Sequence, residues 1–381
     1  MHGSGLNRKH EPLPCFSNSS EEKQSSRWNI VAKPNNGLQP TPSWRLIGKE
    51  NLSVKAITYT QYGPPDVLKL QDVEKPTPKA GEALVKIHAA SVNALDWHLL
   101  TADIFVARFS EGLFKPKRNR LGADLAGRVE AVGSGVTHFQ PGDAVYGDIE
   151  PFGSGAFAEY AAIPATALAP KPASLTFAEA AALPVAALTA LQGLRDVGKI
   201  QAGQRVLING ASGGVGTFAL QIAKSFGAEV TAVCSSRNIE QAQALGADRV
   251  IDYTKTDFTQ SGQQYDLIFA ANGYHPLAAY KRALAPGGVY VMAGGKTKQI
   301  FDVMLWGWWH SRGGDKRLTN VMAHASVPDM RVLNDLIAAG KLKPVIDRRY
   351  PLSQTADALR YLGEGHARGK IVIDVADSEQ R

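Results

Sequence analysis

Residues 203–224 carry the feature that most constrains the fold, a glycine-rich turn between an apolar run and a helical segment. The run Arg205–Asn209 is typical of a buried parallel strand, and helical spacing follows at Thr217–Phe226. This order places backbone N–H groups and a helix N-terminus where a pyrophosphate can bind. The segment therefore predicts a dinucleotide-binding α/β domain with a doubly wound parallel sheet.

The glycines of this turn have separate expected roles. Gly213 and Gly214 let the backbone approach the phosphates, and Gly216 lets the helix pack closely on the strand. Ser212 and Val215 complete the candidate phosphate-binding loop.

Composition limits the class of protein. The chain has 381 residues, 44% of them hydrophobic and 20% charged, which is ordinary for a globular protein of about two domains. Cys15 and Cys234 lie far apart, so a disulfide framework and a cysteine-based metal cluster are both excluded. We interpret both cysteines as free thiols in a reducing compartment, which favours a cytoplasmic location.

Charge and hydropathy restrict the partners. The net charge of +7 is modest, and the cluster at 115–120 is more typical of a solvated loop, or of local attraction for an anionic cofactor, than of a nucleic-acid surface. The strongest apolar stretch, Phe301–Trp309, is too short to span a bilayer. We expect a small-molecule substrate, no nucleic-acid partner and no stable membrane insertion.

Residues 1–53 differ from the rest of the chain. They are rich in Ser, Asn, Pro, Lys and Glu, and they contain neither a sustained apolar period nor a signal-peptide core. We predict a disordered extension. A regular β pattern begins at Val54, which raises the hypothesis that the natural chain starts near that residue.

The pattern beyond this point predicts an interrupted domain. Short strand candidates and turns over 54–172 indicate an antiparallel barrel-like domain. A βα alternation follows, with strands expected at Arg205–Asn209, Glu229–Cys234, Arg249–Asp252, Leu267–Ala270 and Gly288–Ala293. Strand character returns at Val345–Tyr350 and Ile371–Val375. We predict one domain from 54–175 and 305–381, and a nucleotide domain at 176–304.

The end of the second strand of the nucleotide domain bears on the cofactor. An acid there would bind the ribose hydroxyls of NADH, but Ser235 and Arg237 follow Cys234 instead. A guanidinium group can pair with a 2′-phosphate, and Tyr253 could add a hydroxyl. These residues favour NADPH. The alternative is an ordinary polar loop that caps the next helix.

Several further motifs together resemble one family. The chain over 54–381 is similar to the zinc-independent quinone oxidoreductase and zeta-crystallin branch of the medium-chain dehydrogenase/reductases. The segments that match are Gly203–Lys224, Ser91–Asp96, Gly122–Val129, Gly142–Gly147, Gly155–Tyr160 and Gly369–Ile373. The resemblance implies a GroES-like catalytic domain interrupted by a Rossmann domain, an active site in the cleft between them, and a homodimer or homotetramer.

The resemblance also bears on metal. Asn93 stands where zinc-dependent relatives have their first cysteine ligand, Ala123 stands where they have a histidine, and the lobe of four cysteines is missing. We therefore expect no catalytic zinc. A quinone or an α,β-unsaturated carbonyl compound suits such a site, because its conjugated system delocalises the charge that hydride addition creates.

The resemblance nominates three catalytic candidates. Asn93 would lie beside the nicotinamide or the substrate oxygen, with a local turn bond as the alternative. His98 falls where relatives often have an active-site tyrosine and could donate a proton, although a solvent-facing histidine fits equally well. Tyr62 resembles a cleft residue. Asp96 is expected to orient this loop or to cap the following helix.

The same resemblance places further residues along the cofactor. Thr189 would contact the nicotinamide end, unless its hydroxyl bonds its own helix. The remaining candidates are Asn272, Gly294, Gly295 and Lys370.

Two questions stay open. The segment Phe301–His310 could roof a substrate pocket, form a dimer or membrane-surface contact, or pack within the fold. The leading function is an NADPH-dependent quinone or enone reductase. The alternatives are a double-bond reductase for acyl thioesters or alkenals, and a catalytically weak NADPH-binding protein with a structural or regulatory role.

Overall fold

A computed structural model describes residues 53–104, 108–295, 297–312 and 314–375. All of them belong to one compact unit, Glu50–Arg381. The expected disordered extension lies outside the described residues except for Ser53, which begins the first strand, and the expected free thiol of Cys15 also lies outside them.

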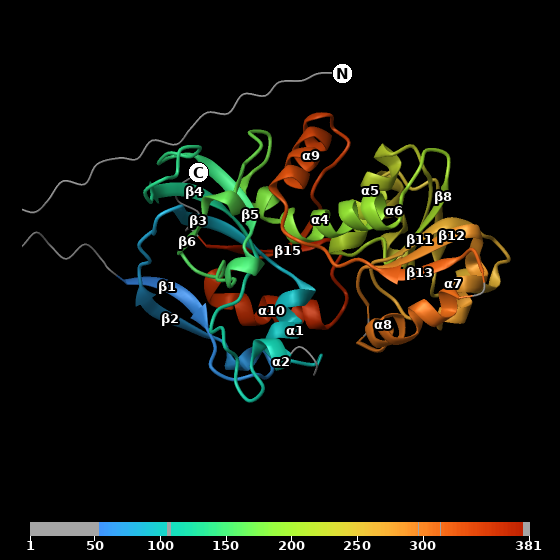
Figure 1. Ribbon diagram of the computed structural model, residues 1–381, viewed down its shortest axis with the longest axis horizontal. Coiled ribbons are helices and arrows are strands. Elements are labelled where there is room, and N and C mark those ends of the chain that lie inside the picture. The colour runs from blue at the N-terminus through green and yellow to red at the C-terminus, as the bar shows by residue number, and fades with distance from the viewer. Residues whose placement is uncertain (1–52, 105–107, 296, 313, 376–381) are drawn as a thin grey trace, which may run out of the picture. The chain divides into compact units, whose positions relative to one another are not determined.

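The helices and strands follow one another as Figure 1 labels them. The strands are β1 (Ser53–Thr58), β2 (Lys69–Glu74), β3 (Glu82–Val92), β4 (Asp124–Val132), β5 (Ala144–Asp148), β6 (Tyr160–Pro164), β7 (Ala169–Pro170), β8 (Arg205–Asn209), β9 (Glu229–Cys234), β10 (Arg249–Asp252), β11 (Tyr265–Ala270), β12 (Leu284–Met292), β13 (Arg317–Asn320), β14 (Ile346–Pro351) and β15 (Lys370–Asp374). The α-helices are α1 (Ala94–Thr101), α2 (Arg108–Glu111), α3 (Phe177–Ala181), α4 (Pro184–Gln192), α5 (Gly214–Ser225), α6 (Ile239–Ala244), α7 (Leu277–Ala283), α8 (Thr297–Ser311), α9 (Val327–Ala338) and α10 (Thr355–Gly363).

The second half of the chain forms a parallel sheet in the order β10-β9-β8-β11-β12-β13. Every neighbouring pair in it is parallel. The chain builds outward from β8 to β10, and then returns to the other side of β8 with β11. This reversal of direction leaves a crevice at the carboxyl ends of β8 and β11, where doubly wound sheets bind their ligands.

The first half forms a β-rich domain whose main sheet is completed by the end of the chain. Its order is β14-β15-β3-β4-β5-β7, with β6 also paired to β3. Strand β15 is antiparallel to β3, with Ile371 opposite Val92. The expected α/β fold class, a β-rich domain interrupted by a doubly wound domain, is confirmed.

The predicted return to the β-rich domain at residue 305 is wrong. Strand β13 pairs in parallel with β12, so the nucleotide-domain sheet extends to Asn320. The sequence signal there is weak because β13 is a four-residue edge strand in which only Leu318 is fully buried.

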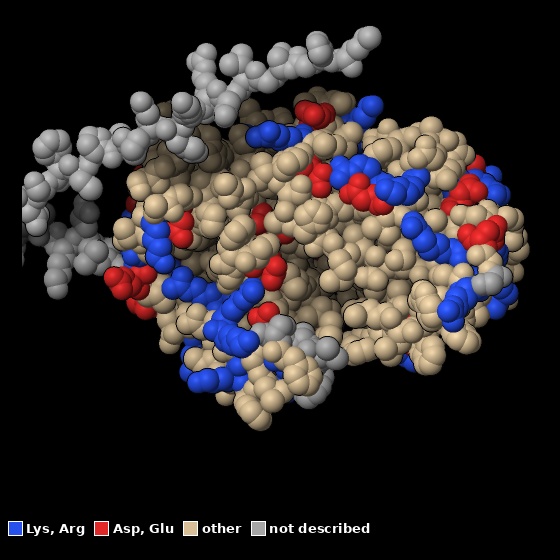
Figure 2. All heavy atoms as spheres, in the orientation of Figure 1, with Lys and Arg blue, Asp and Glu red and all other residues tan. Residues whose placement is uncertain are grey.

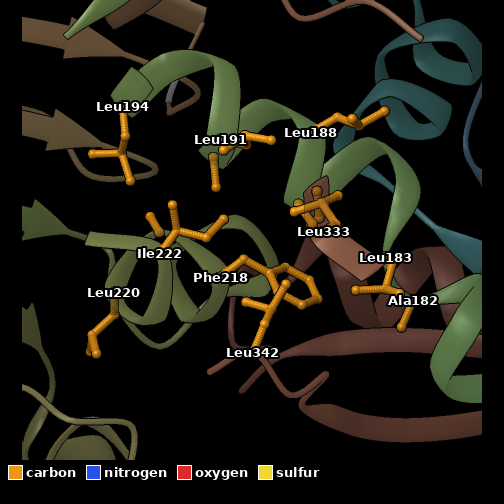
Figure 3. Close-up of a cluster of buried hydrophobic side chains, with 14 of the residues drawn as sticks. Ala182, Leu183, Leu188, Leu191, Leu194, Phe218, Leu220, Ile222, Leu333 and Leu342 are labelled. Carbon is orange, nitrogen blue, oxygen red and sulfur yellow. The ribbon is translucent and has the colours of Figure 1, made fainter. Parts of the chain in front are cut away.

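A continuous core joins the two halves. Figure 3 shows Leu191 of α4, Phe218 and Ile222 of α5 and Leu333 of α9 in one buried cluster. The same cluster includes Tyr146 of β5, whose hydroxyl donates to Asn334 Oδ1 at 2.7 Å. This shared core holds the walls of the crevice in place.

Candidate active site

A cavity of about 590 Å³ lies in the crevice between the two halves. Figure 2 shows the molecule hollowed between the two halves. Pockets of this size and position are the usual sites for small ligands. The wall includes these expected site residues: Asn93, His98, Thr189, Gly213, Gly214, Val215, Gly216, Asn272, Gly294, Gly295 and Lys370.

The glycine turn forms the end of the cavity at the N-terminus of α5. Gly210 has φ +80°, which favours glycine, and Gly213 is the N-cap residue of α5. A Cβ at Gly216 would stand 2.0 Å from the carbonyl oxygen of Gly210. Glycine is therefore required at 216 for this turn to close, and it leaves the helix N-terminus open toward the cavity.

A buried polar cluster forms the opposite wall. Lys370 Nζ donates to Asn93 Oδ1 at 2.5 Å and lies 3.4 Å from Asp124 Oδ2. The amide nitrogen of Asn93 donates to the same Asp124 oxygen at 2.9 Å. Only 3% of Lys370 and none of Asp124 is exposed, and burial lowers the pKa of Lys370. Both ends of the Asn93 amide are thus engaged within the cluster.

Asp124 links three elements of the site, and sequence reasoning missed it. Besides Asn93, its carboxylate accepts from Ser91 Oγ at 2.6 Å and from the backbone N–H of Val185 at 2.9 Å. These bonds connect β3 and β4 to the first turn of α4. The available signal was an acid in the otherwise apolar start of the strand at Gly122–Val129.

Two more carboxyl groups surround this cluster. Asp96 accepts from the backbone N–H of Asn93 at 2.8 Å and of Gly122 at 2.9 Å, which confirms its expected capping role. Burial raises the pKa of Asp96 to about 7. Burial, and then the charge of Asp124, also raises the pKa of Asp148 to about 7. The ammonium group of Lys370 is therefore the buried cation nearest to three buried carboxyl groups, those of Asp96, Asp124 and Asp148.

The other two catalytic candidates occupy different positions. His98 lines the cavity, and its Nδ1 lies 2.7 Å from Asp103 Oδ1. A hydrogen bond at Nδ1 leaves Nε2 as the nitrogen that could exchange a proton. Tyr62 is not among the residues that line the described cavity, and its hydroxyl donates to the carbonyl of Gly112 at 2.8 Å. Its expected role in the cleft stays a prediction.

Thr189 bonds its own helix and also faces the cavity, so both expectations for its side chain stay compatible. Its hydroxyl donates to the carbonyl of Val185 at 2.7 Å, one turn earlier in α4. Thr189 nevertheless lines the cavity. Its hydroxyl oxygen can still accept a hydrogen bond there, because donating to Val185 leaves its lone pairs free.

Four expected cofactor residues lie outside the described cavity wall: Ser212, Ser235, Arg237 and Tyr253. The side-chain amide of Asn238 joins two of them, donating to Ser212 Oγ at 2.9 Å and Ser235 Oγ at 3.2 Å. Tyr253 is 61% exposed. These residues extend from the glycine turn past the ends of β9 and β10.

A second cation stands beside Arg237. The guanidinium of Arg237 donates to the carbonyl of His366, and that of Arg368 donates to the carbonyl of Arg237, each at 3.1 Å. Asp252 lies nearby, bonded to Ser236 and Thr254, whose hydrogen bonds lower its pKa to about 2. Sequence reasoning missed Arg368 because it is 131 residues from Arg237.

The side chains at the expected metal position do not fit zinc. Asn93 binds the ammonium group of Lys370, and Ala123 is a fully buried apolar residue. No group of three His, Cys, Asp or Glu side chains in the described part of the chain could hold a metal ion. No described helix is long and apolar enough to cross a membrane.

Fold and site together define a medium-chain dehydrogenase/reductase with a dinucleotide-binding domain. Residues 79–173 match the alcohol dehydrogenase GroES-like domain, and residues 245–373 match a family described as zinc-binding dehydrogenase. The chain belongs to the quinone oxidoreductase branch of this superfamily, as the resemblance of its motifs predicted.

Individual relatives support this membership. The chain is 35% identical over 335 residues to the chloroplastic quinone-oxidoreductase homolog of Spinacia oleracea, covering 84% of this chain and 98% of that one. It is 35% identical over 336 residues to the chloroplastic NADPH-dependent alkenal/one oxidoreductase of Arabidopsis thaliana, covering 84% and 79%. The solved quinone oxidoreductase of Coxiella burnetii is 31% identical with a TM-score of 0.76, covering 85% and 100%.

Proposed function

We propose that this oxidoreductase uses NADPH to reduce quinones and α,β-unsaturated carbonyl compounds. The observation that carries the proposal is one cavity that joins the open N-terminus of α5 to the Asn93–Lys370 pair. The names of the spinach and Arabidopsis relatives point to the same two acceptor classes.

The residues of the cavity fit the cofactor. The N-terminus of α5, with Gly213 and Gly214, would hold the pyrophosphate through backbone N–H groups. A Cβ at Gly214 would come within 3.0 Å of Lys370 Cδ, so only a glycine keeps this approach open without displacing the lysine. Thr189, together with Asn272, Gly294 and Gly295 at the ends of β11 and β12, would line the ribose and nicotinamide.

The preference for NADPH rests on the exposed end of this path. Arg237 and Arg368 bring two guanidinium groups to the region where a 2′-phosphate would bind, and Ser235 adds a hydroxyl. The carboxylate of Asp252 is ionised, but it accepts from Ser236 and Thr254 and lies 3.7 Å from Lys255 Nζ, which offsets part of its charge.

When bound, NADPH supplies a hydride to the acceptor. Addition of that hydride to a conjugated carbonyl places negative charge on the acceptor oxygen, and protonation completes the two-electron reduction. Lys370 is a cavity-lining cation held by Asn93 and Asp124, so its ammonium group can stabilise the developing charge. His98, fixed at Nδ1 by Asp103, is the proposed proton donor.

Steady-state assays with NADPH and NADH, against a panel of quinones, enones and enoyl thioesters, test this proposal. We expect turnover of a quinone or enone, with NADPH preferred. Asn93→Ala and His98→Ala should lower kcat while cofactor affinity stays unchanged. Turnover of enoyl thioesters alone would support the double-bond reductase alternative. Tight NADPH binding without any turnover would support the binding role.

Arg237→Ala tests the cofactor preference separately. Loss of one charge-assisted contact should raise KM for NADPH about tenfold and leave KM for NADH nearly unchanged. Arg249→Ala is a matched control, because Arg249 is also an exposed arginine but lies at the amino end of β10, whereas Arg237 follows the carboxyl end of β9. An equal effect of Arg237→Ala on both cofactors would contradict the assignment.

A cytoplasmic location and a homodimer or homotetramer remain predictions. Cys234 is a buried free thiol whose pKa burial raises to about 11, as suits an unreactive cysteine in a reducing compartment. Strand β13 ends the parallel sheet, with no further described strand beyond it, but its Leu318 N–H donates to Ser311 Oγ of α8, so only part of this edge is open to a second copy. Light scattering of the purified protein would determine the mass.

A further inference from the structure

Helix α8 carries an unusual concentration of exposed apolar side chains. The exposed fractions are 64% for Met304, 66% for Leu305, 56% for Trp306, 65% for Trp308 and 60% for Trp309. Five of the thirteen large apolar side chains exposed among the described residues therefore lie on this one helix. Monomeric proteins seldom leave such a cluster open to water unless it binds something.

The opposite face of α8 fixes this orientation. Gln299, Val303 and Gly307 are its buried residues, one turn apart from each other. A Cβ at Gly307 would stand 3.1 Å from the carbonyl oxygen of Leu318, so glycine lets the helix lie directly on β13. The backbone N–H of Leu318 also donates to Ser311 Oγ at 3.0 Å. The side of α8 that carries Trp306, Trp308 and Trp309, called the tryptophan face below, is therefore held outward.

The charges around this face are mainly positive. Residues 297–320 contain four Lys and Arg against two Asp, in a chain of net charge +7, and one pair among them, Lys298 and Asp302, lies 3.7 Å apart. The guanidinium of Arg312 lies 3.8 Å from the centre of the Trp308 ring. Figure 2 shows mostly uncharged residues over the position of α8, with Lys and Arg toward its margin. Exposed tryptophan with flanking basic residues is the composition of a surface that rests on anionic lipid.

The apolar face continues into the cavity. Met304 is 64% exposed and also lines the cavity, as do Ile300 of the same helix and the 80% exposed Met322. The mouth of the cavity therefore opens beside the tryptophan face. A bilayer bound there would lie next to the entrance.

We propose that α8 docks this protein onto an anionic lipid bilayer, and that acceptors dissolved in the bilayer enter the cavity past Met304. A second copy of the chain fits this face less well, because two basic margins would then meet. The docking stands independently of any activity. The route of entry rests on the proposed function, and it identifies the acceptors as quinones or enones that carry long hydrocarbon groups.

Vesicle flotation of the full chain, without cofactor or acceptor, tests the docking. We expect the protein to float with vesicles of phosphatidylcholine and phosphatidylserine, and to bind less at high salt. Trp308→Ser/Trp309→Ser should lower the fraction bound about tenfold or more, because two interfacial side chains are lost. Phe114→Ser/Phe152→Ser is the matched control, since it removes two exposed aromatic residues of the other domain and should leave binding unchanged.

Several outcomes would overturn the proposal. One is a wild-type chain that does not float with anionic vesicles, and another is a tryptophan variant that binds as well as the control. A third is a wild-type protein that is dimeric and does not float, while the Trp308→Ser/Trp309→Ser variant is monomeric. That result would assign the face to a second copy.

Activity separates the docking from the proposed reaction. The tryptophan variant should keep wild-type turnover of a water-soluble quinone, because neither residue lines the cavity. It should lose most turnover of a long-chain quinone held in vesicles. Flotation without turnover of any acceptor would refute the proposed function and leave the docking intact. Equal turnover of the vesicle-held quinone by variant and wild type would refute the route of entry.

Discussion

Lys370→Met removes the ammonium group that lies beside Asp124 in the interior. The carboxylate of Asp124 is fully buried, so the loss of this cation leaves a negative charge in a medium that solvates it poorly. Removing one member of a buried pair costs about 3–5 kcal/mol of stability. The hydrogen bonds from Ser91, Asn93 and Val185 remain, so we expect a loss near the lower end, about 3 kcal/mol.

A double-mutant cycle isolates the pair from other effects of the substitution. Asp124→Asn alone should also destabilise the protein, because it removes the nearest carboxylate from Lys370. The double variant Lys370→Met/Asp124→Asn should lose less than the sum of the two, by about 2 kcal/mol. Urea unfolding followed by tryptophan fluorescence at mildly alkaline pH measures these free energies, provided that the m values stay constant.

A surface pair provides the control cycle. Lys224 and Asp248 lie 2.7 Å apart, but their side chains are 32% and 39% exposed. Substituting them in the same way should give a coupling below about 1 kcal/mol. Additive losses at Lys370 and Asp124, within about 0.5 kcal/mol, would refute the view that a buried ion pair organises this wall of the site.

Four other substitutions have defined outcomes. The raised pKa of Asp148 means that the folded state holds its proton more tightly, so stability decreases as pH rises from about 4 through about 7. Asp96 contributes to the same decrease, so Asp148→Asn should remove only its own share, which is about 1.4 kcal/mol for each pH unit that separates the pKa of the folded state from that of the unfolded state. A stability that falls with pH as steeply in the variant as in the wild type would contradict this. Gly216→Ala should weaken NADPH binding at least about tenfold in a fluorescence titration, because its Cβ would clash with the Gly210 carbonyl. Gly213→Ala should weaken NADPH binding less, because its Cβ would lie 3.7 Å from the same oxygen. Phe218→Ala should cost about 3–5 kcal/mol in urea unfolding through the cavity it leaves, and a cost below about 1 kcal/mol would show that the core collapses around it.

The nucleotide domain was the most predictable part of the fold. The strands expected at Arg205–Asn209, Glu229–Cys234 and Arg249–Asp252 have those bounds in the structure. Buried parallel strands are short apolar runs, and each is followed by turn residues, so local composition is sufficient to find them. Strand β13 lacks this signal, which is why the domain boundary was predicted inside α8, before the last strand of the sheet.

The site was less predictable because its contacts are long-range. Asn93 and Lys370 were both expected near the cofactor, but their hydrogen bond joins residues 277 positions apart. Arg368 carries no local pattern that separates it from ordinary bases, and the only signal at Asp124 is an acid in the apolar start of a strand. Only the pairing of β15 with β3 brings Lys370 to Asn93, and only the packing of α4 on this sheet encloses Asp124.

Transfer of deuterium from NADPH that carries deuterium at both hydrogen positions of nicotinamide C4 tests the central claim most directly. With an α,β-unsaturated ketone as acceptor, we expect one deuterium at the β-carbon of a saturated ketone, detected by mass spectrometry and NMR. Deuterium at the carbonyl carbon of an allylic alcohol, or none in any product despite bound NADPH, would contradict hydride transfer to a conjugated acceptor.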